Sequence, residues 1–237
     1  MKAIILAAGE GSRLRPLTYG IPKALLPVRG KPIIDYIIDN ISKCKKIDEI
    51  IVATSYMQDN IKNYLLNTRN DFDIRIVNVL GMETGGDLKT IIEHLGIKEP
   101  ILVAYGDVLT DVDVSKIIES HDKTKGLVTL GLFEVPKENI SKFGIAEFDG
   151  EFIKSFIEKP KEHTSNIASA AYYIIEPEAF DYMSFGRHKI EHILFPRLAK
   201  MGEMRGVLLN PKLWIDIGTY HSYMKANKMV EKLLPPE

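Results

Sequence analysis

The sequence predicts an α/β protein with a mostly parallel central sheet, helices on both faces and an added region of antiparallel hairpins. Apolar segments alternate with amphipathic segments from residue 2 to residue 107, and strand-like segments joined by short turns follow after residue 126. Strands that alternate with helices indicate βαβ units and a parallel sheet, whereas consecutive strands indicate hairpins. Both patterns are therefore expected in one molecule.

The first half of the chain supplies the parallel part. Residues 2–6 form a continuous apolar run, which is typical of a strand buried on both faces. Pro32 precedes isoleucines at helical spacing, a pattern typical of a helix start. The elements expected next are strands at 49–55, 72–79 and 100–107 and helices at 58–68 and 85–96, the last closed by Gly96.

The second half has a different rhythm. The expected elements are strands at 126–135, 143–150, 151–160 and 168–175, followed by helices at 189–200 and 218–234. The turn at 148–151 joins two of these strands into a hairpin. No linker rich in Pro, Gly or Ser interrupts the sequence, so a single domain over 1–237 is predicted.

Composition restricts the classes of function. The 237 residues are 45% hydrophobic and 27% charged, with a net charge of −1. This balance argues against nucleic acid and against an anionic membrane surface as partners. The single Cys44 and the lack of an apolar run long enough to span a bilayer predict a cytoplasmic protein. Any anion must therefore be recognised by a local site.

The loop that follows the first strand is the strongest candidate for that site. Gly9 and Gly11 allow backbone N–H groups to approach an anion, and Arg13 and Lys23 add positive charge. The dinucleotide fingerprint is excluded because Leu14 stands where its third glycine belongs, and the loop lacks the Gly-Lys-Ser/Thr ending of a P-loop. A long, flexible phosphate-binding loop is predicted, with a solvated basic loop as the alternative.

Longer motifs give a more specific indication. The segments LAAGEGSRLRPLT, PKALLPV and GKP, followed in order by ETGGDLKT, YGD, FGIAEFD, EKP and WIDIGTYHSYMKAN, resemble the signature of the sugar-1-phosphate nucleotidyltransferases. The resemblance covers essentially the whole chain and implies a single catalytic domain with a nucleotide-binding half at 1–125 and a sugar-phosphate-binding half at 126–237. It implies a Rossmann-like fold and an enzyme that joins a nucleoside triphosphate to a sugar-1-phosphate, releasing pyrophosphate. Catalysis of this kind rests on positioning and electrostatics.

The resemblance also implies roles for individual residues. Arg13 would contact the leaving pyrophosphate, and Lys23 would bridge phosphate oxygens near the α-phosphorus. Asp107 and Asp216 would hold Mg²⁺, which usually takes one or two protein carboxylates. Helix capping is the alternative role for both aspartates. The residues implied in nucleotide binding are Ala8, Gly9, Gly11, Glu83, Thr84, Gly85 and Gly86.

The sugar side matches the family less well. The resemblance implies that Glu158 binds sugar hydroxyls and that Lys159 binds the sugar phosphate. Ser169 stands where the family commonly has an asparagine that contacts the sugar, and Ala171 stands where glycine is common. These differences leave the sugar undetermined and keep open a cytidylyltransferase that acts on a non-sugar phosphate.

The sequence is compatible with two further alternatives for the function. The segment HKIEH, from His188 to His192, fits a zinc-peptidase pattern if one helix carries both imidazoles, but no third ligand is evident. A catalytically silent regulatory subunit that binds nucleotide sugar would be expected to lose the phosphate and metal residues, and all are retained here. The active enzyme is therefore favoured.

Several properties stay open at this stage. The base, the sugar, feedback regulation and the oligomeric state are not determined by the sequence, and a homo-oligomer is compatible with it. We expect no C-terminal β-helix, because no hexapeptide repeats precede the end of the sequence at EKLLPPE.

Overall fold

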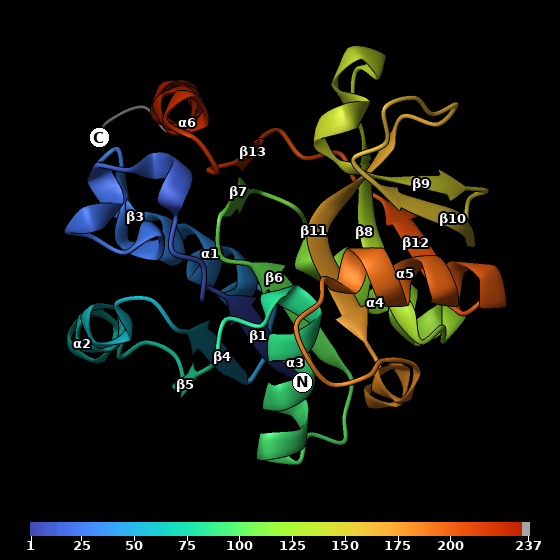
Figure 1. Ribbon diagram of the computed structural model, residues 1–237, viewed down its shortest axis with the longest axis horizontal. Helices are drawn as coiled ribbons and strands as arrows, with labels where there is room; N and C mark the ends of the chain where they lie inside the picture. The colour runs from blue at the N-terminus through green and yellow to red at the C-terminus, as the bar shows by residue number, and fades with distance from the viewer. Residues whose placement is uncertain (234–237) are drawn as a thin grey trace. The chain divides into compact units, whose positions relative to one another are not determined.

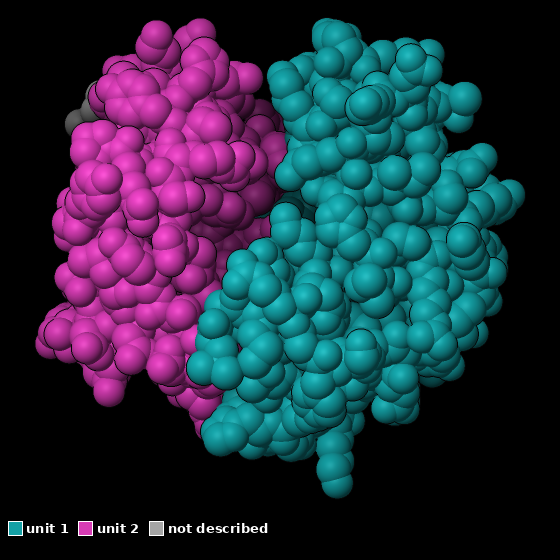
Figure 2. Space-filling view, viewed as in Figure 1, with its two compact units in different colours: residues 1, 80–103, 113–210 teal, residues 2–79, 104–112, 211–237 magenta. Residues whose placement is uncertain are grey.

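A computed structural model describes residues 1–233 of the chain. It divides into two compact units that interleave along the sequence. Unit 1 comprises residues 1, 80–103 and 113–210, and unit 2 comprises residues 2–79, 104–112 and 211–237 (Figure 2). The last four residues of the segment EKLLPPE, on which the expectation about a C-terminal β-helix rests, lie outside the described part.

Unit 2 is built on parallel strands, as the alternating pattern predicted. Strand β1 pairs with β4 and β4 with β5, and all three run in the same direction (Figure 1). The helices α1 and α2 lie in the connections between these strands, and α6 comes last in the chain. The bounds are β1 Lys2–Leu6, β2 Pro27–Val28, β3 Lys31–Pro32, α1 Ile33–Ser42, β4 Glu49–Thr54, α2 Gln58–Thr68, β5 Ile74–Asn78, β7 Val108–Thr110, β13 Trp214–Asp216 and α6 Tyr220–Leu233.

The core of unit 2 follows from its apolar strands and one helix face. All three central residues of β1 and nearly all of β4 are inaccessible to water, as expected for strands covered on both faces. Five isoleucines of α1, all at most 1% exposed, pack at helical spacing. The carboxyl ends of β1 and of the strand before Asp107 are thereby held rigidly.

Unit 1 contains the antiparallel strands. Strand β11 pairs antiparallel with β8 and with β9, β9 pairs antiparallel with β10, and β12 adds a parallel pair with β8. The helix α4 packs on β8, β11 and β12, and α5 packs on β10 and β12. The bounds are α3 Glu83–Leu95, α4 Val114–Thr124, β8 Val128–Glu134, β9 Gly144–Phe148, β10 Ile153–Glu158, β11 Ile167–Ile175, α5 Ile190–Met201 and β12 Met204–Leu208. Strand β6, Ile101–Tyr105, runs from unit 1 into unit 2.

The predicted fold class is confirmed as mixed α/β with mostly parallel central pairing and added antiparallel strands. Some boundaries differ from the prediction. Helix α3 begins at Glu83, two residues before the predicted start at Gly85, so the whole segment ETGG forms its first turn. Among residues 1–233, no helix is both long and apolar enough to cross a bilayer.

Candidate active site

The loop after β1 is folded, in contrast to the flexible segment that the sequence predicted. Three 3₁₀ turns, Ser12–Leu14, Leu17–Tyr19 and Lys23–Leu25, follow one another. Gly11 has φ +64, a left-handed conformation that favours glycine, and a Cβ there would lie 3.0 Å from Thr18 and 3.1 Å from Lys23. The buried hydroxyl of Thr18 donates to the carbonyl of Gly11 at 2.9 Å. The loop therefore closes on itself and fixes the position of Lys23.

Lys23 reaches the end of a strand far away in the sequence. Its Nζ lies 2.6 Å from Oδ2 of Asp107, which follows β6, and the Lys23 side chain is only 12% exposed. The N–H of Gly106 donates to the carbonyl of Leu6 at 2.9 Å, which joins the end of β1 to the segment that carries Asp107. A charge-assisted hydrogen bond of this length is among the stronger polar contacts in proteins.

Asp216 and Arg13 meet beside this ion pair. Strand β13 pairs antiparallel with β7, so that Asp216 lies opposite Val108, and the N–H of Ile217 donates to the carbonyl of Asp107 at 2.8 Å. A Cβ on Gly218 would lie 2.9 Å from Nη2 of Arg13 and 3.0 Å from Oδ1 of Asp216. Both of those atoms therefore border the same small space, which only glycine leaves open.

Two cations and two carboxylates thus gather within unit 2 from three separate parts of the sequence. We call Arg13, Lys23, Asp107 and Asp216 the charged cluster. Arg13 and Asp216 are exposed to solvent, so a ligand can reach them. Asp107, just before β7, and Asp216, at the end of the paired strand β13, fit Mg²⁺, because this ion usually takes one or two protein carboxylates and completes its octahedron with phosphate oxygens and water. The arrangement suits a phosphorylated, metal-bound ligand.

The predicted sugar-phosphate residues lie in unit 1. Glu158 ends β10, and its Oε1 lies 3.2 Å from Nζ of the next residue, Lys159, whose side chain is more than half exposed. A Cβ on Gly144 would lie 2.8 Å from Oε2 of Glu158 and 2.3 Å from the ring of Phe156. Glycine at residue 144 therefore makes room for the Glu158 carboxylate at the strand end.

Ser169 lies where β11 departs from regular pairing. The register with β8 shifts between Ser169 and Tyr173, and the Ser169 Oγ accepts a hydrogen bond from the N–H of Ala171 at 3.2 Å. Ala171 has φ +62, a conformation that costs an L-residue about 1 kcal/mol or more. The bulge explains why glycine is common at this position in the family that the sequence resembles.

The turn Glu83–Gly86 is the last group of predicted nucleotide-binding residues. The amides of Gly85 and Gly86 donate to the carbonyl of His188, and the carboxylate of Asp87 accepts from the N–H of Met82 at 2.8 Å. Burial raises the pKa of the Asp87 carboxyl above its usual range. The turn is thus held by contacts inside unit 1. Ala8 and Gly9, by contrast, belong to the loop after β1 in unit 2.

The histidine pair does not have the helical geometry that the zinc alternative requires. His188 lies before α5, which begins at Ile190, and only His192 is on the helix. His188 instead contributes backbone bonds, accepting from Gly85 and donating to the carbonyl of Met82. Within residues 1–233 no group of three or more His, Cys, Asp or Glu side chains is placed to hold a metal.

Sequence reasoning missed four residues that shape the site. Gly106, Gly144 and Gly218 permit close backbone approaches beside Asp107, Glu158 and Asp216, and Thr18 closes the loop. The signal was present, because all three glycines lie inside the motifs YGD, FGIAEFD and WIDIG. Gly106 directly precedes Asp107, Gly144 pairs with Glu158 across the strands, and Gly218 follows Asp216 by two residues. Steric roles of this kind become evident only once the neighbours in space are known.

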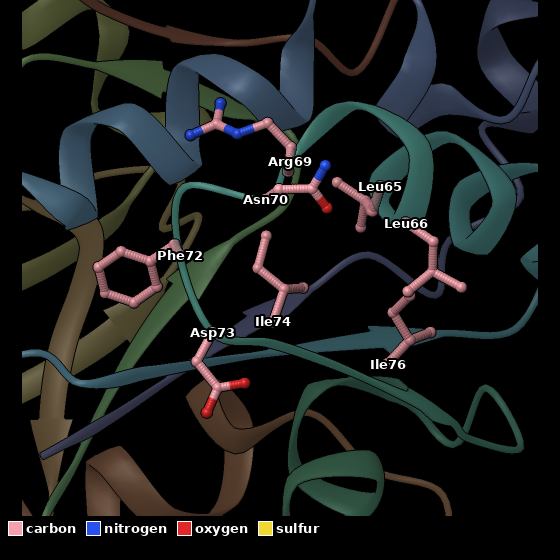
Figure 3. Close-up of a pocket in the computed structure, with 8 residues that line it drawn as sticks. All are labelled: Leu65, Leu66, Arg69, Asn70, Phe72, Asp73, Ile74 and Ile76. Atoms are coloured by element: carbon pink, nitrogen blue, oxygen red, sulfur yellow. The ribbon is translucent and has the colours of Figure 1, made fainter.

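A cavity elsewhere in unit 2 is separate from these residues. It has a volume of about 280 Å³ and lies between α2 and β5, where Leu65, Leu66 and Ile76 supply apolar walls and Arg69 lies at one side (Figure 3). None of the predicted site residues lines it. The charged cluster therefore stays the best candidate for chemistry.

The fold and the charged cluster together define an α/β protein that gathers two cations and two carboxylates at the carboxyl ends of its strands, the edge where open α/β sheets bind ligands. The chain belongs to the nucleotidyl transferase family, whose model matches residues 2–232. This membership confirms the resemblance noted from the sequence.

Individual relatives support this assignment. The chain is 31% identical to a UTP–glucose-1-phosphate uridylyltransferase of Synechocystis sp. over 95% of its length, and 30% identical to mannose-1-phosphate guanylyltransferase 1 of Arabidopsis thaliana over 97%. It spans 62% and 64% of those two proteins. Its fold matches that of a UDP-glucose pyrophosphorylase complexed with UDP-glucose, with a TM-score of 0.84, 24% identity and 98% of both chains covered.

Proposed function

We propose that the chain transfers a nucleotidyl group from a nucleoside triphosphate to a sugar-1-phosphate, giving a nucleoside diphosphate sugar and pyrophosphate. An oxygen of the sugar phosphate forms a bond to the α-phosphorus, and the bond from that phosphorus to the oxygen of the leaving pyrophosphate breaks. Because both reactants are anions, the protein must offset their repulsion and stabilise the charge that develops on the leaving group. The charged cluster has the residue types that this requires.

The observation that carries the proposal is the convergence of Arg13, Lys23, Asp107 and Asp216. The Lys23 to Asp107 contact of 2.6 Å and the shared border at Gly218 join three parts of the sequence. Arg13, which is exposed, suits the pyrophosphate because a planar guanidinium can bind two phosphate oxygens at once. Lys23, held by the folded loop, suits the oxygens near the α-phosphorus as a compact point charge.

The metal role belongs to the two aspartates. Mg²⁺, when bound, neutralises phosphate charge and orients the triphosphate. Asp107 and Asp216 would hold it. Lys23 counters the charge of Asp107 until a triphosphate offers oxygens to that lysine. The Mg²⁺ dependence is part of the proposal.

The remaining residues would bind the two substrates. Ala8, Gly9 and Gly11 would line the nucleotide with backbone groups, and the turn Glu83–Gly86 would border the base. Glu158 would bind sugar hydroxyls, Lys159 would bind the sugar phosphate, and Ser169 would border the sugar. The names of the relatives place glucose-1-phosphate with UTP and mannose-1-phosphate with GTP first among the pairs to test. Cytoplasmic location and a homo-oligomer stay predictions.

The experiment is a matrix of nucleoside triphosphates against sugar-1-phosphates, with pyrophosphate release measured in the presence and absence of Mg²⁺. We expect release with at least one pair, and only when the metal is present. Release with phosphocholine and CTP alone would instead support a non-sugar acceptor. No pyrophosphate release from any pair, together with tight binding of a nucleotide sugar, would support the alternative that the chain is a catalytically silent regulatory subunit.

A further inference from the structure

The first turns of α3 and α5 cap each other. The amide of Gly85 donates to the carbonyl of His188 at 3.0 Å, and the amide of Gly86 donates to the same oxygen at 3.4 Å. In return, the hydroxyl of Thr84 accepts from the N–H of Ile190 at 3.0 Å, and that hydroxyl donates to Oε2 of Glu191 at 2.7 Å. Each helix start thus satisfies backbone donors of the other, which otherwise lack partners inside their own helix.

The fit between the two segments is tight. A Cβ on Gly85 would lie 2.6 Å from the imidazole of His188, and a Cβ on Gly86 would lie 2.4 Å from the carbonyl oxygen of Gly186. Real Cβ atoms essentially never come so close to other atoms. The Gly-Gly pair therefore makes room for residues 186–188 of the same chain, and its two amides are engaged with His188.

Further contacts fasten the segment that leads into α5. Lys89, only 8% exposed, donates from Nζ to the carbonyls of Phe180 at 3.0 Å and Met183 at 2.5 Å. The same ammonium lies 4.6 Å from the ring centre of Phe185. A buried lysine needs such partners because burial disfavours an unpaired charge. Lys89 thus holds the start of the segment 180–191, and residues 84–86 hold its end.

We propose that residues 186–191, here named the cap segment, position the turn Glu83–Gly86 for recognition of the nucleotide base, with Glu191 as the positioning residue. Glu191 acts through Thr84, whose hydroxyl joins the turn to both Ile190 and Glu191. The inference rests on the proposed function, which assigns this turn to the nucleotide base. A shift of about 1 Å in such a turn can reduce activity about 100-fold.

The test compares Glu191→Leu with Glu191→Gln. Leucine removes the acceptor of the Thr84 hydroxyl, whereas glutamine keeps an oxygen that can accept the bond. We expect Glu191→Leu to raise the KM for the triphosphate about tenfold or more and to reduce the discrimination between bases, because the turn is no longer fixed. We expect kcat and the KM for the sugar-1-phosphate to stay within about twofold, and glutamine to restore the wild-type triphosphate KM.

The matched control is Thr90→Val. The Thr90 hydroxyl lies on the same helix and donates only to the carbonyl of Gly86 at 2.8 Å, one turn earlier. This variant removes a partly buried hydrogen bond within α3 and no hydrogen bond to the cap segment. We expect it to leave the KM for the triphosphate unchanged. An equal KM in Thr90→Val and Glu191→Leu would overturn the proposal, as would an unaltered KM in Glu191→Leu.

A second pair keeps the proposal testable if Glu191→Leu does not fold. Thr84→Val removes the hydroxyl, and Thr84→Ser retains it, so only valine should weaken triphosphate binding measured by calorimetry. Equal binding by the two variants would overturn the positioning role. A wild-type chain that binds triphosphate but releases no pyrophosphate contradicts the proposed function instead, while the calorimetric comparison still decides the role of the cap segment.

Discussion

The charged cluster of unit 2 and the cap segment of unit 1 show two different ways of fixing a site. The cluster holds Arg13, Lys23, Asp107 and Asp216 by charge attraction and close backbone approaches, with two side chains open to solvent. The cap segment fixes the turn Glu83–Gly86 by mutual backbone capping and by the partly buried hydrogen bond from the Thr84 hydroxyl to Glu191. The first arrangement suits charged ligands and catalysis, and the second suits precise placement of a recognition surface.

The largest effect is expected from a change of Asp107, one of the two carboxylates of the charged cluster. Asp107→Asn should reduce turnover by about 10² to 10³-fold or more while the protein stays folded, because an amide is a poor ligand for Mg²⁺ and no longer pairs with the Lys23 charge. Pyrophosphate release and circular dichroism check the two parts of this prediction. Asp111→Asn is the control, since the carboxylate of the exposed Asp111 accepts from the N–H of Leu213, a bond that an amide oxygen can also accept. Most of the activity retained in Asp107→Asn would contradict the metal assignment.

The next effect separates two arginines of one loop. Arg13→Ala should lower kcat about 100-fold, the scale of losing one preorganised group that stabilises the leaving pyrophosphate. Arg15→Ala should have little effect, because Arg15 pairs with Glu10 at 3.3 Å and lies over the ring of Tyr19. Steady-state kinetics of both variants give the comparison. Equal kcat values in the two variants would contradict the role proposed for Arg13.

A single methyl group tests the geometry of the cluster. In Gly218→Ala the new Cβ would lie 2.9 Å from the mobile guanidinium tip of Arg13 and 3.0 Å from the Asp216 carboxylate, so both should be displaced without unfolding. We expect a loss of kcat of about tenfold with an unchanged Tm. Gly20→Ala is the matched control, because nothing lies within 4 Å of a Cβ there. A fully active Gly218→Ala would contradict the claim that the positions of Arg13 and Asp216 beside residue 218 matter for the reaction.

A smaller effect concerns the stability of unit 1. Ala171→Gly should stabilise the protein by about 0.5–1 kcal/mol, because glycine adopts the left-handed φ of +62 without strain. Ala170→Gly should be destabilising, since the buried Ala170 packs in the same strand. Chemical denaturation of both variants measures the difference. Destabilisation in both would contradict the strain at residue 171.

The smallest effect concerns a second group of charges, Asp39 with Lys31 and Arg69, which contains none of the predicted site residues. Burial raises the pKa of the Asp39 carboxyl, but hydrogen bonds from Lys31 and Arg69 outweigh it and leave the pKa below its usual range. A lowered pKa in the folded protein means that Asp39 stabilises fully above its unfolded pKa and loses this contribution as pH falls through the folded value. Asp39→Asn should therefore reduce stability at pH 7 and change it little in strong acid. Thermal unfolding at both pH values tests this, and a loss of equal size at both would contradict it.

The sequence was most informative where structure depends on local pattern. The alternation of apolar runs with isoleucine-rich helices predicted β1, α1 and β4, since a strand or helix buried on one or both faces leaves that periodicity in the sequence. The order of the motifs selected Arg13, Lys23 and Asp107, and the structure brings these residues into one unit.

Contacts between distant segments could not be read in the same way. The predicted helix began at Gly85, whereas α3 begins two residues earlier at Glu83. Its first turn makes backbone bonds to the carbonyl of His188, about a hundred residues later in the sequence, which no local pattern reveals. The meeting of Arg13 with Asp216 depends on the pairing of β13 with β7, a long-range register that no local pattern encodes. Tertiary packing decided both features.

The most direct test of the account follows the α-phosphorus of the triphosphate. Wild-type protein and Asp107→Asn are incubated with Mg²⁺, a sugar-1-phosphate and a triphosphate radiolabelled at that atom. The account predicts that the label moves into a nucleoside diphosphate sugar with the wild type, that added pyrophosphate returns it to the triphosphate, and that both transfers are at least about 100-fold slower with Asp107→Asn. A label that stays in the triphosphate for every pair tested, or that moves equally well with Asp107→Asn, would contradict it.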